Sequence, residues 1–158
     1  MGIHVSYKLT GSGWSECTVA IKEQRVTITA SYLSDAWGDL LAAVVRIVEG
    51  ETEAMASFTE EPGEYRWRLI RMGSDRLLVR IIEFPDFWGD KPDEEGKLIF
   101  DAECRLRTFA GAVLSASQRL LEEHGIEGYL GKWVEHPFPL ERQERLRQLL
   151  DEPDQGRN

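Results

Sequence analysis

The fold class is decided by residues 53–83, EAMASFTEEPGEYRWRLIRMGSDRLLVRIIE, in which apolar and polar residues alternate around two turn signals. A period of two is typical of strands that bury one face and expose the other. Pro62-Gly63 is a turn pair, and Gly73-Ser74-Asp75 is a second turn signal. The stretch therefore predicts three antiparallel strands joined by two hairpins, with one face covered and the other facing water.

The same pattern predicts the register of both hairpins. With residues 62–63 at the centre of the first turn, Phe58 lies opposite Trp67 and apolar side chains face apolar ones. A slip of one residue would move every side chain of the strand to the opposite face of the sheet. In the second hairpin, a three-residue loop at 73–75 places Ile81 opposite Trp67, whereas a two-residue loop would set an arginine there. The longer loop is the one predicted.

The rest of the chain completes an α+β pattern. Alternating residues predict further strands over residues 3–10, 14–22, 25–33 and 97–105. Apolar residues at helical spacing predict a helix that begins at Ser34 or Asp35 and ends at Gly50, and two more over residues 106–124 and 140–150. We expect one antiparallel sheet of six to seven strands, with two main helices packed on one face and a short C-terminal helix. Residues 1–150 would form one domain, and residues 151–158 a disordered polar tail.

The charge balance limits the partners. The 158 residues carry 19 Lys and Arg against 28 Asp and Glu, a formal net charge of −9. Binding to nucleic acid is disfavoured, because phosphate recognition needs a surplus of basic residues. A basic protein is a possible partner, although acidic charge also serves solubility alone. The absence of a long apolar run and of a signal-peptide pattern predicts a cytoplasmic protein with no membrane partner.

Signatures of catalysis, metal binding and cofactor binding are missing from the sequence. It has no GxSxG, HExxH, P-loop or GxGxxG pattern. Cys17 and Cys104 lack metal-site spacing and are expected to be buried free thiols. His136 lies where a general base is conceivable, but nothing pairs it with a nucleophile. We predict no catalytic residue, no metal and no cofactor.

Charged side chains should project from the open face of the predicted sheet. These residues are Arg66, Arg68, Arg80, Asp101 and Glu103. The commoner interpretation of such a set is cross-strand ion pairing on a solvated surface. The alternative is an arginine-lined site that grips a carboxylate or an acidic loop.

The irregular segment 84–96 is the best candidate for binding a partner. It combines two aromatic residues with five acidic ones: Asp86, Phe87, Trp88, Asp90, Asp93, Glu94 and Glu95. Aromatic residues anchor interfaces, and acidic neighbours steer a basic partner. Alternatively, both rings tuck under the sheet and the acids only face solvent. The acid spacing does not match a calcium-binding EF-hand loop.

Three segments carry a resemblance to known proteins. They are SDAWGDLL at 34–41, EPGEYRW at 61–67 and WVEHPFP at 133–139. With these segments the chain resembles a family of uncharacterised bacterial proteins that are single α+β domains, which implies no activity. In its class features the chain is also similar to immunity proteins of bacterial toxin systems, which are small, acidic and cytoplasmic.

The function expected from these observations is binding of a protein without catalysis. The chain would be an immunity-type inhibitor of a basic toxin, acting through segment 84–96. One alternative is a small-ligand-binding protein or enzyme that uses the charged open face. Another is a homodimer built through an uncovered sheet edge or through the Trp88 segment.

Overall fold

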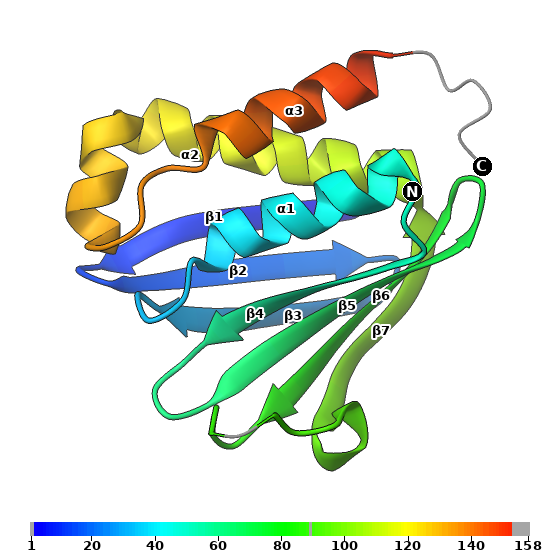
Figure 1. Ribbon diagram of the computed structural model, residues 1–158, viewed down its shortest axis with the longest axis horizontal. Helices are drawn as coiled ribbons and strands as arrows, with labels where there is room; N and C mark the ends of the chain where they lie inside the picture. Colours follow the sequence, from blue (N-terminus) through cyan, green and yellow to red (C-terminus); the bar gives the residue numbers. More distant parts are fainter. Residues whose placement is uncertain (1, 89, 153–158) are drawn as a thin grey trace.

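The computed structural model describes residues 2–88 and 90–152. Figure 1 shows three helices on one side of the strands. The elements in chain order are β1 (Ile3–Gly11), β2 (Trp14–Ile21), β3 (Gln24–Ser31), α1 (Ala36–Glu49), β4 (Glu53–Thr59), β5 (Glu64–Gly73), β6 (Arg76–Phe84), the 3-10 turn η1 (Asp93–Glu95), β7 (Lys97–Arg105), α2 (Leu106–Trp133) and α3 (Leu140–Asp151).

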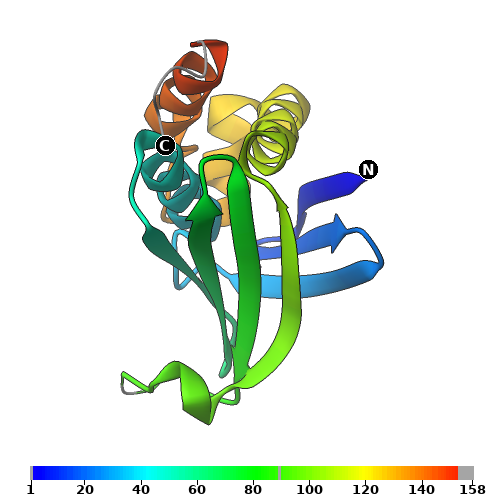
Figure 2. The ribbon, with the colours of Figure 1, turned by 90° about the vertical axis from the view of Figure 1, so that its right-hand side faces the viewer.

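The strands form two antiparallel sheets, a three-stranded sheet in the order β1-β2-β3 and a four-stranded sheet in the order β4-β5-β6-β7. The α+β class is confirmed, but the expected single sheet of six to seven strands is wrong. After β3 the chain leaves through α1 and returns in β4, which hydrogen-bonds only to β5 as a strand. Figures 1 and 2 show the strands of the two sheets running in crossing directions.

Side chains join the two sheets where backbone pairing does not. The Gln24 amide on β3 donates from Nε2 to the Asp101 carbonyl on β7 and accepts from the Asp101 N–H at 3.0 Å. At the other end of β3, Ser31 Oγ donates to the Thr59 carbonyl on β4 at 3.1 Å. Strand β3 therefore crosses the four-stranded sheet and touches both of its outer strands.

The register of the second hairpin is as predicted, and that of the first is not. Trp67 pairs with Ile81 as predicted, but the loop is not the expected 73–75: Gly73 pairs with Arg76, and a bulge between Arg71 and Gly73 supplies the extra residue. Phe58 pairs with Tyr65 instead of Trp67, because the first turn spans residues 60–63, where the Glu60 N–H donates to the Gly63 carbonyl at 2.7 Å. The shift is two residues, so each side chain stays on its predicted face.

The core lies between the helices and the inner faces of both sheets. Trp67 and Val79 are fully buried, and the next residue on each strand, an arginine, faces the other side. Helix α1 packs on β4 and β5, α2 packs on β1, and α3 packs on α1 and α2. The rings of Tyr7 and Trp37 join sheet and helix, with centroids 4.5 Å apart. The predicted sorting of side chains by face is confirmed, but the outer layer is not hydrated throughout, since Arg66 on that face is buried.

Strand β7 departs from simple alternation near its start. The sequence pattern puts Leu98 on the same side as Phe100, but Leu98 is 50% exposed and Phe100 is buried. The cause is a bulge: Ile81 pairs with Phe100, whereas Ile82 pairs with Leu98, so one extra residue reverses the alternation.

Helix α2 consists of two helical stretches. The first breaks at Gly125, whose φ is 70°, directly after the predicted end at His124, and the second, which the sequence analysis does not predict, continues to Trp133. This left-handed conformation suits glycine, and the redirected helix buries Tyr129 and Trp133 completely. No helix in the described part of the chain is long and apolar enough to cross a membrane.

The third helix lies where it is expected, and the predicted disordered tail, residues 151–158, stays a prediction. Asp151 is the last residue of α3, and residues 153–158 lie outside the described residues. Both cysteines are buried free thiols, as expected. Burial raises the pKa of Cys17 to about 12 and that of Cys104 to about 11.

Candidate functional site

Segment 85–96, between β6 and β7, folds back over one end of the open face of the four-stranded sheet. This end is remote from the helices (Figures 1 and 2). Ile82 and Phe84 alternate with the core-facing residues of β6, and both are buried. Gly96 fits against them because it has no side chain: a Cβ there would lie 2.8 Å from the Phe84 ring. The segment is thus packed onto the sheet rather than projecting from it.

Arg66, on β5, binds the segment from the sheet side. Its side chain is only 7% exposed, and its Nη1 donates to Asp93 Oδ1 at 2.8 Å and to the Lys91 carbonyl at 2.7 Å. The guanidinium carbon lies 4.3 Å from the centroid of the Phe84 ring, a cation–π contact. Glu64 Oε2 is 3.6 Å from its Nε. A buried arginine needs such partners, because an unpaired charge in the interior is costly.

Arg68 grips the same carboxylate from the next position on that face. Its Nε donates to Asp93 Oδ2 at 2.8 Å and its Nη2 to Asp93 Oδ1 at 3.1 Å. This two-pronged geometry is the strong form of an arginine–carboxylate pair. The hydrogen bonds from Arg68 first, and from Arg66 second, hold the pKa of Asp93 below its usual range. The two groups of residues predicted separately therefore meet at Asp93.

The other charged residues of the open face are also paired within the chain. Arg80 Nε lies 3.3 Å from Asp101 Oδ1, directly across the β6–β7 ladder. Glu103 pairs with Arg76, at 2.9 Å, rather than with Arg80. Cross-strand pairing, the commoner of the two interpretations, describes this part of the face.

The outer side of the segment carries the remaining acidic and aromatic residues. Trp88 is 68% exposed, and its ring lies 4.7 Å from that of Phe87 between centroids. Asp86 accepts hydrogen bonds from the Lys91 ammonium and from the Trp88 N–H, and the Lys91 contact is the main cause of its lowered pKa. We call the residues of this surface the acidic loop surface: Asp86, Phe87, Trp88, Asp90, Asp93, Glu94 and Glu95.

Three carboxylates of the acidic loop surface have no ion pair within the described residues. Asp90, Glu94 and Glu95 are exposed, and no salt bridge or side-chain hydrogen bond joins them to residues 2–88 or 90–152. The turn η1 positions two of them, since the Gly96 N–H donates to the Asp93 carbonyl at 3.0 Å. The carboxylate that anchors the segment, Asp93, is thus only partly exposed, whereas these three face solvent.

A cavity of about 460 Å³ lies between the segment and the sheet. Its lining residues are Met55, Ser57, Thr59, Glu64, Arg66, Arg68, Phe87, Asp90, Lys91 and Pro92. Sequence reasoning missed Glu64 and Lys91 as parts of this site. The strand parity that placed Arg66 on the open face also places Glu64 there, so this residue could have been found. Within the described chain, no three His, Cys, Asp or Glu side chains are grouped to hold a metal ion.

Comparison with known proteins gives one informative match. No protein-family model matches the sequence, and no curated protein matches it. Among solved structures, the chain is similar to a chain of the CdiA-CT/CdiI toxin and immunity complex from Enterobacter cloacae. The two share 11% identity and a TM-score of 0.51, over 74% of this chain and 99% of the other. At this identity the match shows a similarity of fold alone. Membership of an uncharacterised bacterial family stays a prediction.

Proposed function

We propose that this chain is a non-enzymatic binding protein of the immunity type, which captures a basic protein through the acidic loop surface. The observation that carries the proposal is that the arginines of this site are paired within the chain, whereas several of its carboxylates are not. Arg66 and Arg68 are balanced from within the chain by Asp93 and Glu64. Asp90, Glu94 and Glu95 have no ion pair within the described residues and lie in the same segment as the exposed Trp88. The surface therefore offers negative charge and an aromatic anchor together.

Such a surface suits a basic protein for two physical reasons. A large exposed aromatic side chain contributes strongly to binding energy when a partner buries it. Unpaired carboxylates raise the association rate of a basic partner and select against acidic ones. The net charge of −9 acts in the same direction.

The anchoring of the segment adds to this fitness for binding. The segment between β6 and β7 is pinned by Asp93 to two arginines and packed through Gly96 onto Phe84. A surface that is already ordered loses little conformational entropy when a partner docks. The fold match to a chain of a toxin and immunity complex supports the same function class.

A small-ligand site in the cavity is the second candidate, and the cavity volume of about 460 Å³ is the observation in its favour. A carboxylate ligand would have to displace Asp93 from both arginines, and this weighs against it. A homodimer is the third candidate. Size-exclusion chromatography of the free chain tests it, since a monomeric elution at micromolar concentration argues against this role.

The decisive experiment expresses the basic proteins, if any, encoded beside this gene in its native genome and measures their binding to this chain. The loop variant Trp88→Ala/Asp90→Asn/Glu94→Gln should weaken binding at least about 100-fold, because it removes the aromatic anchor and two charges. The matched control Glu122→Gln/Glu127→Gln removes two exposed charges from α2 and should change affinity less than about threefold. Equal binding by the loop variant, or the absence of any basic neighbour that binds, would overturn the proposal.

A further inference from the structure

The outer edge of β4 leaves backbone groups at its centre without a hydrogen bond in the described structure, although α1 packs beside this strand. On β1, Arg119 Nη2 donates to the Val5 carbonyl and α2 packs alongside. Strands β3 and β7 are linked at one point, where the Gln24 amide bonds the backbone of Asp101. An open edge presents free N–H and C=O groups that template the pairing of another strand, so proteins normally blunt it.

Backbone geometry shows which β4 groups point outward. The Thr52 carbonyl, just before β4, accepts a hydrogen bond from the Arg71 N–H on β5. Because the pattern alternates along an antiparallel strand, the even-numbered residues of β4 direct their backbone N–H and C=O groups toward β5. The N–H and carbonyl of Thr59 instead meet Ser34 Oγ and Ser31 Oγ, on the outer side. Residues 53, 55, 57 and 59 therefore direct their backbone groups away from the sheet.

At the middle of this edge most backbone groups have no partner. The Met55 carbonyl accepts a long, exposed hydrogen bond of 3.4 Å from Arg46 Nη2. No hydrogen bond within residues 2–88 and 90–152 engages the Met55 N–H or the backbone of Ser57. The Met55 side chain is 44% exposed and lines the cavity beside the acidic loop surface, as does Ser57. The edge is thus continuous with the proposed binding site.

We propose that the β4 edge accepts an extended, basic segment of the partner as an added strand. The inference rests on the proposed function, since it states how the captured protein docks. Main-chain hydrogen bonds to Met55 and Ser57 would supply the pairing, and alternate side chains of the added strand would lie over the cavity.

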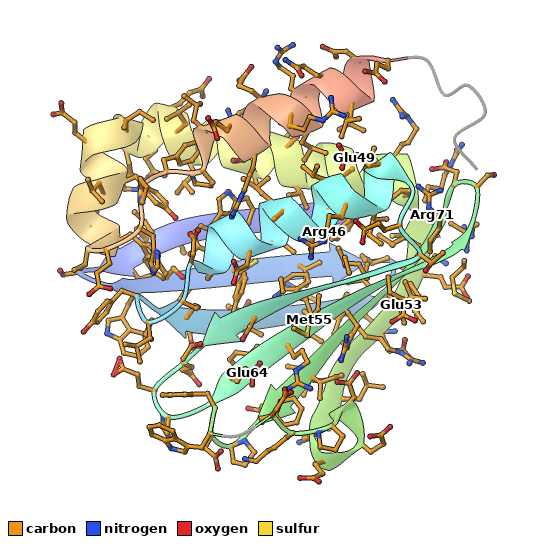
Figure 3. All side chains as sticks on the ribbon, in the orientation of Figure 1. Arg46, Glu49, Glu53, Met55, Glu64 and Arg71 are labelled. Carbon is orange, nitrogen blue, oxygen red and sulfur yellow. The ribbon has the colours of Figure 1, made fainter. Side chains whose placement is uncertain are left out.

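Carboxylates at both ends of the strand favour a basic occupant. Figure 3 shows Glu53 on β4 near one end. Glu49, also near this end, is paired with Arg145, and Glu64, near the other end, is paired with Arg66. Glu51 and Glu61 are also exposed at these ends. The nearby Arg71 is committed to the carbonyls of Ile47 and Ser74. A second copy of this chain would instead bring together two molecules of net charge −9.

The test uses a synthetic probe and does not require the natural partner. The probe is an acetylated and amidated eight-residue peptide that alternates Lys with Val, and its control carries Glu in place of Lys. Residue-resolved hydrogen exchange should show fast exchange at Met55 and Ser57 in the free chain. Saturating basic peptide should slow both on the order of tenfold, and the acidic peptide should not.

Two variants sharpen the test. Met55→Pro deletes the outward N–H at a place where an edge strand tolerates proline, and it should abolish the protection of Ser57. Arg46→Leu removes the competing donor and a positive charge, and should strengthen peptide binding a few-fold. If Met55→Pro does not fold, the exchange pattern and Arg46→Leu still decide.

The outcomes separate this inference from the proposed function. Protection at Met55 and Ser57 that survives in Trp88→Ala/Asp90→Asn/Glu94→Gln supports the edge, whatever that variant does to toxin capture. Peptide binding without protection there overturns the edge proposal and leaves the loop proposal standing. Protection in the free chain that grows with protein concentration shows self-pairing and also overturns it.

Discussion

At the scale of single residues, Asp93 is the side chain on which the candidate site depends. One carboxylate accepts hydrogen bonds from Arg66 and Arg68, which reach it from the face of a neighbouring strand. Removing it would leave Arg66 with a 7% exposed side chain and few partners. The segment would then lose its anchor while the core beneath stayed intact.

Asp93→Ala should lower the free energy of unfolding by about 1–2 kcal/mol, because it breaks charge-assisted hydrogen bonds at a partly exposed site. Urea denaturation measures the change. The matched control is Glu94→Ala, whose carboxylate is exposed in the same turn and should matter by less than about 0.5 kcal/mol. Equal effects of the two variants would contradict the anchoring role.

The contribution of Asp93 should also depend on pH in a defined direction. Its pKa in the folded chain is lowered from the ordinary value of 3.8 by Arg68 first and Arg66 second. Between the two values the unfolded chain binds more protons, so stability rises with pH there. The contribution is fully present above the unfolded pKa and is lost as pH falls through the folded pKa.

The stability difference between wild type and Asp93→Ala should therefore be constant from about pH 7 to pH 5 and shrink below about pH 4. Urea denaturation at a series of pH values measures it. A difference that already declines between pH 7 and pH 5 would point to another titrating group.

At the scale of secondary-structure elements, a buried chain of hydrogen bonds joins the three helices. Trp37 Nε1 on α1 donates to Ser117 Oγ on α2 at 3.0 Å, and Ser117 Oγ donates to Gln143 Oε1 on α3 at 2.7 Å. All three residues are buried. Polar groups in such a place fix the relative position of their elements, because an unsatisfied partner in the interior is costly.

Ser117→Ala should lower the free energy of unfolding by about 1–3 kcal/mol, because it strands the Trp37 N–H and the Gln143 oxygen away from water. The control Ser115→Ala makes the same chemical change at an exposed position of α2 and should be neutral within about 0.5 kcal/mol. Thermal denaturation of both variants provides the comparison. A neutral Ser117→Ala would mean that the three helices are held by apolar packing alone.

At the scale of the whole molecule, the junction between the two sheets is made by a side chain. The Gln24 side-chain amide donates one hydrogen bond to the backbone of Asp101 on β7 and accepts one from it, as a residue of a neighbouring strand would. This links β3 and β7 at one point without a regular ladder. Strand β4 forms the other border of the four-stranded sheet, beside the acidic loop surface.

Gln24→Ala should destabilise the fold by about 1 kcal/mol and speed hydrogen exchange at the Asp101 amide, because both hydrogen bonds across the junction are lost. Glu23→Ala, a change at the exposed neighbouring turn residue, should leave that amide unaffected. Unchanged exchange at Asp101 in Gln24→Ala would show that the sheets are joined by packing only.

Local pattern and turn chemistry determined which side of its strand each residue occupies. Alternation placed Trp67 inside and Arg68 outside, and a shift of two residues in the first hairpin left this unchanged. Sequence also singled out the members of the acidic loop surface, since aromatic and acidic residues cluster there in the chain itself. These features depend on neighbours only a few positions apart.

Only the tertiary structure decided how those parts meet. Asp93 reaches Arg66 across 27 positions, and Gln24 reaches Asp101 across 77, so no local period encodes either contact. The division into two sheets, the continuation of α2 past Gly125 and the unpaired backbone groups at the centre of the β4 edge follow from the same long-range packing. Periodicity assigns a side chain to a face, whereas its partner across that face is set by how distant segments fill a shared volume.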